Sequence, residues 1–164
     1  MTKWIPEIAT LPEKKLAGVR VPMSVAADRT PQLWRSFMPR RKEITNNPHV
    51  VLFSVRVYNT PMLLDPFDAS QLFDKWAALE IFDERSLPDG FERLILPAGE
   101  YAVFQYKGSS SDPRIFQYIF GQWLPNSPYM LDHRPQFELL GERYVNNSPD
   151  SEEEIWIPIA RRSS

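Results

Sequence analysis

The sequence predicts an α+β fold in which two pseudo-symmetric strand-helix-strand-strand repeats form one curved antiparallel sheet, with the helices on one face. Strand and helix periodicities alternate in the second half of the chain, and the same apolar pattern recurs in the first half. In addition, 16 prolines and 13% aromatic residues favour many strands with marked turns over a helical bundle. At 164 residues we expect a single domain over 1–164, with repeat 1 at about 10–85 and repeat 2 at about 90–162.

The second repeat shows each element in turn. Residues 91–107 alternate apolar side chains as strands do, with a break at 97–99, where the sequence is Pro-Ala-Gly. Asp112 and Pro113 are residue types that begin a helix, and apolar residues then recur at helical spacing until Pro125. We expect strands at 137–140 and 154–159 to complete the repeat.

When the sequence is compared with itself at an offset of 82 positions, the same pattern appears in the first half of the chain. Pro31 then falls on Pro113, so a helix is expected at 31–38 as well as at 113–124. Val55 and Val57 fall on Phe137 and Leu139. With a small register adjustment in the loop, residues 77, 79 and 81 take the places of 155, 157 and 159. A concave sheet face opposite the helices, near the pseudo-twofold axis, is then the expected place for a ligand.

Composition and charge exclude several classes of protein. The chain has no cysteine and two histidines, so we expect neither a disulfide framework nor a metal site, and no cofactor is indicated. With a net charge of −2, the chain has no positive electrostatic potential that would attract the phosphates of a nucleic acid, so no direct nucleic-acid binding is expected. Without a signal peptide or a run of about 18 apolar residues, we expect a cytoplasmic chain with no membrane contact.

One pair of residues stands out as a candidate site. If the alternation of Phe137 and Leu139 means burial under the helix, Glu138 faces the opposite side of the sheet. Trp156 is expected on that same side, because Ile155 and Ile157 take the helix side. A carboxylate beside a tryptophan on a concave apolar face predicts a ligand site. The alternative is an exposed strand glutamate without a role.

Arg56 occupies the position of repeat 1 that matches Glu138, on the same face as Tyr58. If the two strands approach each other, Arg56 and Glu138 form a structural ion pair across the pseudo-axis instead. That pairing would neutralise the carboxylate and weaken any preference for a cationic ligand.

Further aromatic residues are weaker candidates for ligand contacts. Tyr118 lies off the apolar stripe of its helix, Tyr129 lies in the expected loop 125–136, and Trp76 lies on a strand of repeat 1. Tyr101 and Tyr106 are candidates of the same kind, whereas Trp34, Phe37, Phe116 and Phe120 are assigned to the core. No nucleophile motif and no glycine-rich phosphate loop occurs, so no catalytic residue is predicted.

The second half resembles the GyrI-like, or AraC-type, effector-binding family. The resemblance rests on LPAGEYAVF at 96–104, YIFGQWLP at 118–125, PQFE at 135–138 and EIWIPI at 154–159, and more loosely on FDKWAALE at 73–80. It implies the same α+β fold and binding of bulky, often cationic or aromatic compounds, in a family often fused to the DNA-binding helices of transcription regulators. The family's ligand-contacting glutamate matches Glu138, and an aromatic of its last strand matches Trp156, where tyrosine is commoner.

These observations lead to a stand-alone protein that binds a small hydrophobic or cationic molecule at the pseudo-twofold axis, with Glu138 at the centre. The resemblance also implies an alternative, hydrolysis of strained electrophilic compounds, in which Glu138 activates water and a tyrosine stabilises the developing anion. A gyrase-modulating or other protein-interaction role through the same concavity is a third hypothesis, with an unknown partner.

Overall fold

The computed structural model describes residues 4–44, 51–64, 66–82, 87–109, 112–141 and 148–163. Over these ranges the strands are β1 (Glu7–Leu11), β2 (Lys14–Met23), β3 (Leu52–Val57), β4 (Phe73–Glu80), β5 (Glu92–Leu96), β6 (Gly99–Lys107), β7 (Tyr129–Leu131), β8 (Gln136–Leu140) and β9 (Glu152–Arg161). The helical elements are α1 (Thr30–Phe37), a 3-10 segment η1 (Met38–Glu43), α2 (Arg114–Tyr118), a π-helical segment η2 (Ile119–Trp123) and α3 (Leu124–Asn126).

Eight of these strands follow the order β1-β6-β9-β8-β3-β4-β2-β5, with β7 added beside β9, and every pairing is antiparallel. The order is symmetric about the β8–β3 pair, because β6-β9-β8 mirrors β2-β4-β3. Each half is a strand-helix-strand-strand unit, so the predicted pseudo-twofold fold is confirmed. The axis passes between β3 and β8, whose residues therefore come from opposite repeats.

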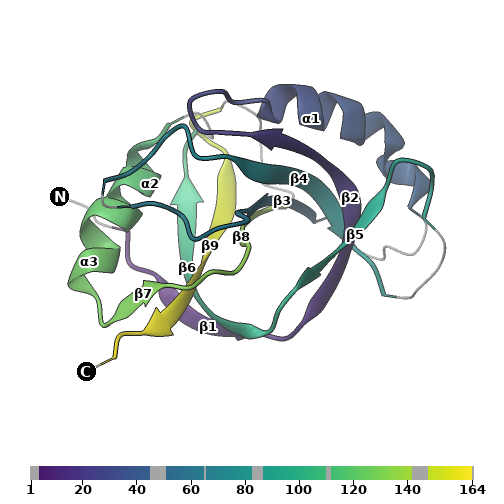
Figure 1. Ribbon diagram of the computed structural model, residues 1–164. Coiled ribbons are helices and arrows are strands. Elements are labelled where there is room, and N and C mark those ends of the chain that lie inside the picture. The colour runs from purple at the N-terminus through teal and green to yellow at the C-terminus, as the bar shows by residue number, and fades with distance from the viewer. Residues whose placement is uncertain are drawn as a thin grey trace.

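Strand register shows that both helices cover the same sheet face. Ala77, Ser54, Glu138 and Ile155 form one row across β4, β3, β8 and β9, and side chains paired in this way point to one side. Ala77 packs in the cluster under α1, and Ile155 packs in the cluster under α2. Figure 1 shows α1 over one end of the sheet and α2 with α3 over the other, with both termini on the α3 side.

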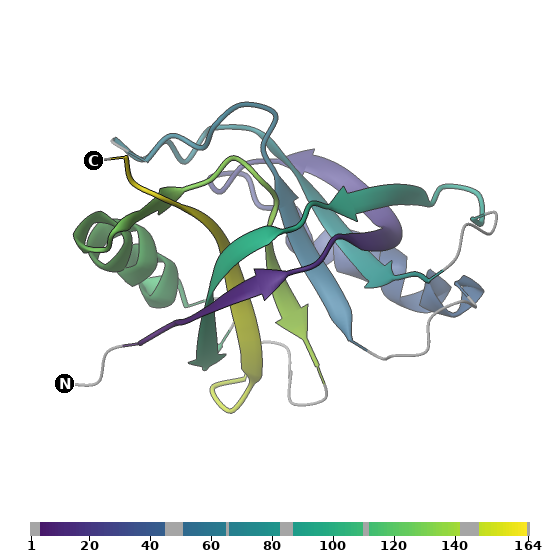
Figure 2. The ribbon, with the colours of Figure 1, turned by 90° about the horizontal axis from the view of Figure 1, so that it is seen from below.

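The opposite face of the sheet is filled rather than open. The neighbouring row of Trp76, Val55, Phe137 and Trp156 points into a core cluster that contains no helix residue. This cluster is closed at the two corners where β1 continues into β2 and β5 continues into β6. The residues that close it are Leu11, Leu16, Leu96 and Tyr101. Figure 2 shows β1 and β6 crossing in front of the central strands. The expected concave ligand face is therefore wrong, because the curled ends of the sheet occupy it.

The second helix differs from expectation in its detail. It begins near Pro113, where the Arg114 backbone N–H donates to Asp112 Oδ1 at 3.0 Å, and Ile115 and Ile119 bury against β9. Its middle turn is π-helical and contains Gly121, and Pro125 lies in the last turn. The expected loop 125–136 also contains β7, which pairs with β9.

Among the described residues, no helix has both the length and the apolar character needed to cross a lipid bilayer.

A close approach between β2 and β4 gives the first prediction. A Cβ added to Gly18 would lie 2.0 Å from the carbonyl oxygen of Ala77 and 2.7 Å from Cα of Ala78, both backbone atoms that have no freedom to move aside. Gly18→Ala should therefore lower the free energy of unfolding by about 1–3 kcal/mol or more, through overpacking. Gly141→Ala is the matched control, because none of the described residues lies within 4 Å of its added Cβ. Urea unfolding of both variants checks this, and equal stabilities would contradict the close approach.

Candidate functional site

Glu138 is the central ionisable side chain on the two strands that meet at the pseudo-axis, β3 and β8. Its row partners Ser54 and Ile155 place Glu138 on the helix-covered face. The side chain is 14% exposed, so the carboxylate is largely removed from water. A carboxylate in this position needs a cation or several donors nearby to remain charged.

Arg56 supplies the nearest such cation. Its Nη2 lies 3.9 Å from Oε1 of Glu138, which joins the two repeats across the axis. The guanidinium also stacks on Phe116 of α2, with its carbon 4.7 Å from the ring centroid, and lies 5.9 Å from the centroid of Phe73. At 3.9 Å the ion pair is long, so the stacking on Phe116 holds Arg56 at least as firmly as the carboxylate does.

Two further buried ionisable side chains lie near this pair. Lys75 on β4 is 4% exposed, and Glu153 on β9 is 6% exposed. Burial, assisted by the charge of Arg56, lowers the pKa of Lys75 to about 8, while Glu138, Asp28 and Glu153 oppose the shift. The pKa of Lys75 therefore lies close to neutral pH, where its ammonium group begins to lose a proton.

Glu153 is shifted in the direction expected for a buried acid. Burial and then the neighbouring Glu138 carboxylate raise the pKa of Glu153 to about 9, against the opposing charges of Lys75 and Arg56. The Glu153 side chain is within hydrogen-bonding reach of Glu138, and its Oε2 has no hydrogen-bond partner among the described residues. At neutral pH, Glu153 is thus a neutral acid beside Glu138.

The cavity at this cluster is small. It measures about 10 Å³ and is lined by Arg56, Phe116, Gln136, Phe137, Glu138, Ile155 and Ile157. That volume holds at most about one water molecule. Phe116 and the Arg56 guanidinium stacked on it cover Glu138, so a larger ligand reaches the carboxylate only if these two side chains move.

The expected pairing of Glu138 with Trp156 is wrong. Trp156 stacks on Phe137, at 5.4 Å between ring centroids, in the core on the far face of the sheet, and its Nε1 donates to Glu154. Trp76 lies in that same core. The predicted side of the sheet is correct for Ile155 and Ile157 but wrong for Phe137 and Leu139. The apolar residues of β8 face away from the helices, because the helix-free face of the sheet is also buried.

The three tyrosines proposed as ligand contacts lie in two places. Tyr58 packs on Phe73, at 4.8 Å between centroids, and lines a cavity of about 240 Å³ next to the Glu138 cluster. Tyr118 and Tyr129 line a separate depression of about 500 Å³ on the outer side of α2 and α3. The structure therefore brings Arg56, Tyr58 and Glu138 together and leaves the other predicted site residues elsewhere.

Sequence reasoning missed four residues of this region: Lys75, Phe116, Gln136 and Glu153. Lys75 interrupts the apolar alternation of residues 73, 77, 79 and 81, and Glu153 precedes the alternation of 155, 157 and 159. A charge on the buried side of such a strand is a signal that could have found both. Phe116 was assigned to the core because its helical spacing matches that of Ile119 and Phe120.

Comparison with known proteins agrees with this architecture. The model of the family described as GyrI-like, the GyrI-like small molecule binding domain, matches residues 6–160, so the chain belongs to this family. No match was found among curated proteins.

Several solved structures share the fold at low sequence identity. The EcmrR C-terminal domain is 14% identical, with a TM-score of 0.70 over 98% of this chain and 100% of that domain. In the complex of EcmrR with DNA, the match covers 97% of this chain but 58% of that chain, with 14% identity and a TM-score of 0.68. SAV2435 bound to tetraphenylphosphonium is 16% identical, with a TM-score of 0.62 over 94% of this chain and 93% of that chain.

A protein from Listeria innocua described as a hydrolase is 13% identical, with a TM-score of 0.58 over 95% of this chain and 92% of that chain. At these identities the likeness shows a shared fold.

The raised pKa of Glu153 predicts a pH-dependent cost to stability. The unfolded chain ionises Glu153 near pH 4.5 and the folded chain only near pH 9, so stability from this group is lost as the pH rises between these values. Glu153→Gln mimics the neutral acid and should raise the free energy of unfolding by about 1–3 kcal/mol at pH 7, with little gain at pH 4.

Urea unfolding at pH 4, 7 and 8 measures this gain. Glu7→Gln, at an exposed carboxylate on β1, is the control for a general charge effect. A loss of stability for Glu153→Gln at pH 7 would mean that Glu153 is ionised and paired instead.

Proposed function

We propose that this protein binds an apolar or aromatic organic cation at the cavity lined by Arg56, Phe116 and Glu138, with Glu138 as the counter-ion. The observation that carries the proposal is the dehydrated Glu138 carboxylate on the pseudo-axis, whose nearest cation, Arg56, is held 3.9 Å away by stacking on an aromatic ring. Membership of a small-molecule binding family supports it, as does the tetraphenylphosphonium bound to SAV2435, a protein of the same fold.

Without a ligand, Arg56 occupies the position in this cavity that a ligand cation would take. Its flat guanidinium lies over the Phe116 ring and faces Glu138, and these are the two contacts that an aromatic cation needs. Ligand binding then exchanges one cation for another, so the buried carboxylate is paired in both states. The exchange requires Arg56 to leave the cavity and Phe116 to shift enough to admit the ligand, and the free energy of that opening lowers the observed affinity.

A cationic ligand should depend on the charge of Glu138. Glu138→Gln nearly preserves the volume of the side chain and removes its charge, so binding of tetraphenylphosphonium should weaken by about ten- to hundredfold, the effect of a lost charge-assisted contact. Triphenylphosphine oxide, which is neutral and similar in shape, should lose less than about threefold. Isothermal titration of both compounds against both proteins measures this, and equal losses for the two compounds would refute the counter-ion role.

Removal of Arg56 should have the opposite effect. Arg56→Met keeps the aliphatic contact with Phe116 but removes the competing cation, so tetraphenylphosphonium should bind about tenfold more tightly than to the wild-type protein. Arg20→Met is the matched control, since Arg20 lies over Trp76 on the other face and pairs with Asp74 and Glu92. If Arg56→Met binds tetraphenylphosphonium more weakly than the wild-type protein, while Arg20→Met binds it equally well, then Arg56 contacts the ligand and does not compete with it.

A second candidate function is hydrolysis of a strained electrophile, and the Glu138–Glu153 pair favours it. One carboxylate beside a carboxyl group of raised pKa is the arrangement that general acid–base chemistry uses. The two functions are distinguished by turnover. If the pair activates water, the protein hydrolyses styrene oxide to the diol faster than buffer alone, and Glu138→Gln loses that excess rate; a purely binding protein leaves the background rate unchanged.

A further inference from the structure

A second cavity adjoins the Glu138 cluster along the same strands. It has a volume of about 240 Å³, and its walls include Tyr58, Met62, Met130 and Gln136. Tyr58 comes two residues after Arg56, and Gln136 comes two residues before Glu138, in strands that run antiparallel with Arg56 opposite Gln136. Gln136 lines both cavities and is therefore the partition between them.

Gln136 carries an unused hydrogen-bonding atom at this partition. The residue is 4% exposed, and its Oε1 is buried without a hydrogen-bond partner in the part of the chain that the structure describes. Its Nε2 lies 3.3 Å from Sδ of Met62. A thioether sulfur accepts weakly and cannot donate, so the amide is oriented with its nitrogen toward Met62 and its carbonyl oxygen free. Leaving a buried carbonyl oxygen unpaired is costly unless a ligand donor meets it.

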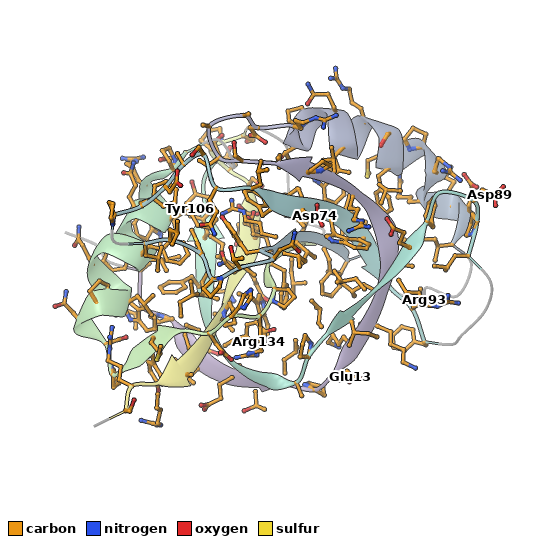
Figure 3. All side chains as sticks on the ribbon, in the orientation of Figure 1. Glu13, Asp74, Asp89, Arg93, Tyr106 and Arg134 are labelled. Atoms are coloured by element: carbon orange, nitrogen blue, oxygen red, sulfur yellow. The ribbon has the colours of Figure 1, made fainter. Side chains whose placement is uncertain are left out.

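The other walls of the cavity are already held in place. His133 Nε2 lies 2.9 Å from the carbonyl oxygen of Tyr58, which ties the segment after β7 to the end of β3. Arg134, labelled in Figure 3, donates to Asp132 at 2.6 Å and to the carbonyl oxygen of Glu100 at 2.7 Å. Its guanidinium carbon lies 4.7 Å from the centre of the Tyr101 ring. The cavity thus has a fixed wall on one side and two flexible methionines, Met62 and Met130, on the other.

We infer that this cavity is a second compartment of the ligand site, which takes an apolar arm bearing an N–H donor for Gln136 Oε1. This inference rests on the proposed function, because the same molecule places its cationic centre at Glu138. Residues two apart on a strand are about 7 Å apart, a span that a two- or three-ring compound covers. A volume of about 240 Å³ lies below the usual range of about 300–1,000 Å³ for a whole ligand, which fits part of one.

Two dyes test the donor directly. Thionine and methylene blue share one tricyclic phenothiazinium cation, but thionine ends in amino groups with N–H donors and methylene blue ends in dimethylamino groups without them. Gln136→Met removes the acceptor and keeps an unbranched side chain of similar length. Thionine should bind Gln136→Met about tenfold more weakly than the wild-type protein, and methylene blue should change by less than about twofold.

Fluorescence or calorimetric titration of the full chain gives these affinities, and the thermal midpoint of Gln136→Met checks its fold. Loss of an unpaired buried oxygen should leave that midpoint unchanged or raise it. If Glu138→Gln weakens both dyes while Gln136→Met affects them equally or not at all, the second compartment is refuted and the cation site stands. If Glu138→Gln weakens neither dye, the proposed function fails and this inference fails with it.

Discussion

Burial of charged side chains between two helices is the constraint on which the rest of this structure depends. Arg56, Lys75, Glu138 and Glu153 come from four adjacent strands, two in each repeat, and all lie on the face that α1 and α2 cover. The cost of removing these groups from water is reduced by the pairing of Arg56 with Glu138 and by the neutral form of Glu153. The β3–β8 pairing at the pseudo-axis is what brings them within that range.

This arrangement explains why the helices cover the ends of the sheet and not its centre. Under α1 and α2 the strands supply Ala77, Leu79, Ile155 and Ile157, and the packing is apolar. At the axis the same row supplies Ser54 and Glu138, polar side chains whose hydrogen bonds an apolar helix face could not satisfy. The small cavity at the axis is lined by Arg56, Glu138 and Phe116, and a larger cavity with Met62 and Met130 in its wall lies beside it. These are the parts that recognition of an amphipathic cation requires.

Much of the fold could be predicted from the sequence because the repeat is strong. The match of Pro31 with Pro113 and the apolar stripes that follow located both helices, and the break at Pro97 correctly separated β5 from β6. Of the site, Arg56, Tyr58 and Glu138 were predicted and are brought together, with the ion pair of Arg56 and Glu138 anticipated as an alternative. Lys75, Phe116, Gln136 and Glu153 were missed, since each lies within a pattern otherwise typical of core residues.

The sequence by itself determined both helices, the main strands of the two repeats and the pseudo-symmetry, because local periodicity and a repeated pattern need no knowledge of distant contacts. Only the tertiary structure decided which side of each strand carries the site. Phe137 and Trp156 on one face of the sheet, and Ile155 and Ile157 on the other, are equally apolar, so alternation alone could not assign the helices to either. The choice depends on Leu11, Leu16, Leu96 and Tyr101, which reach the far face only because the two ends of the sheet curl over it. With that face filled, the ionisable side chains can lie only on the sheet face that carries the helices, where Glu138 is found.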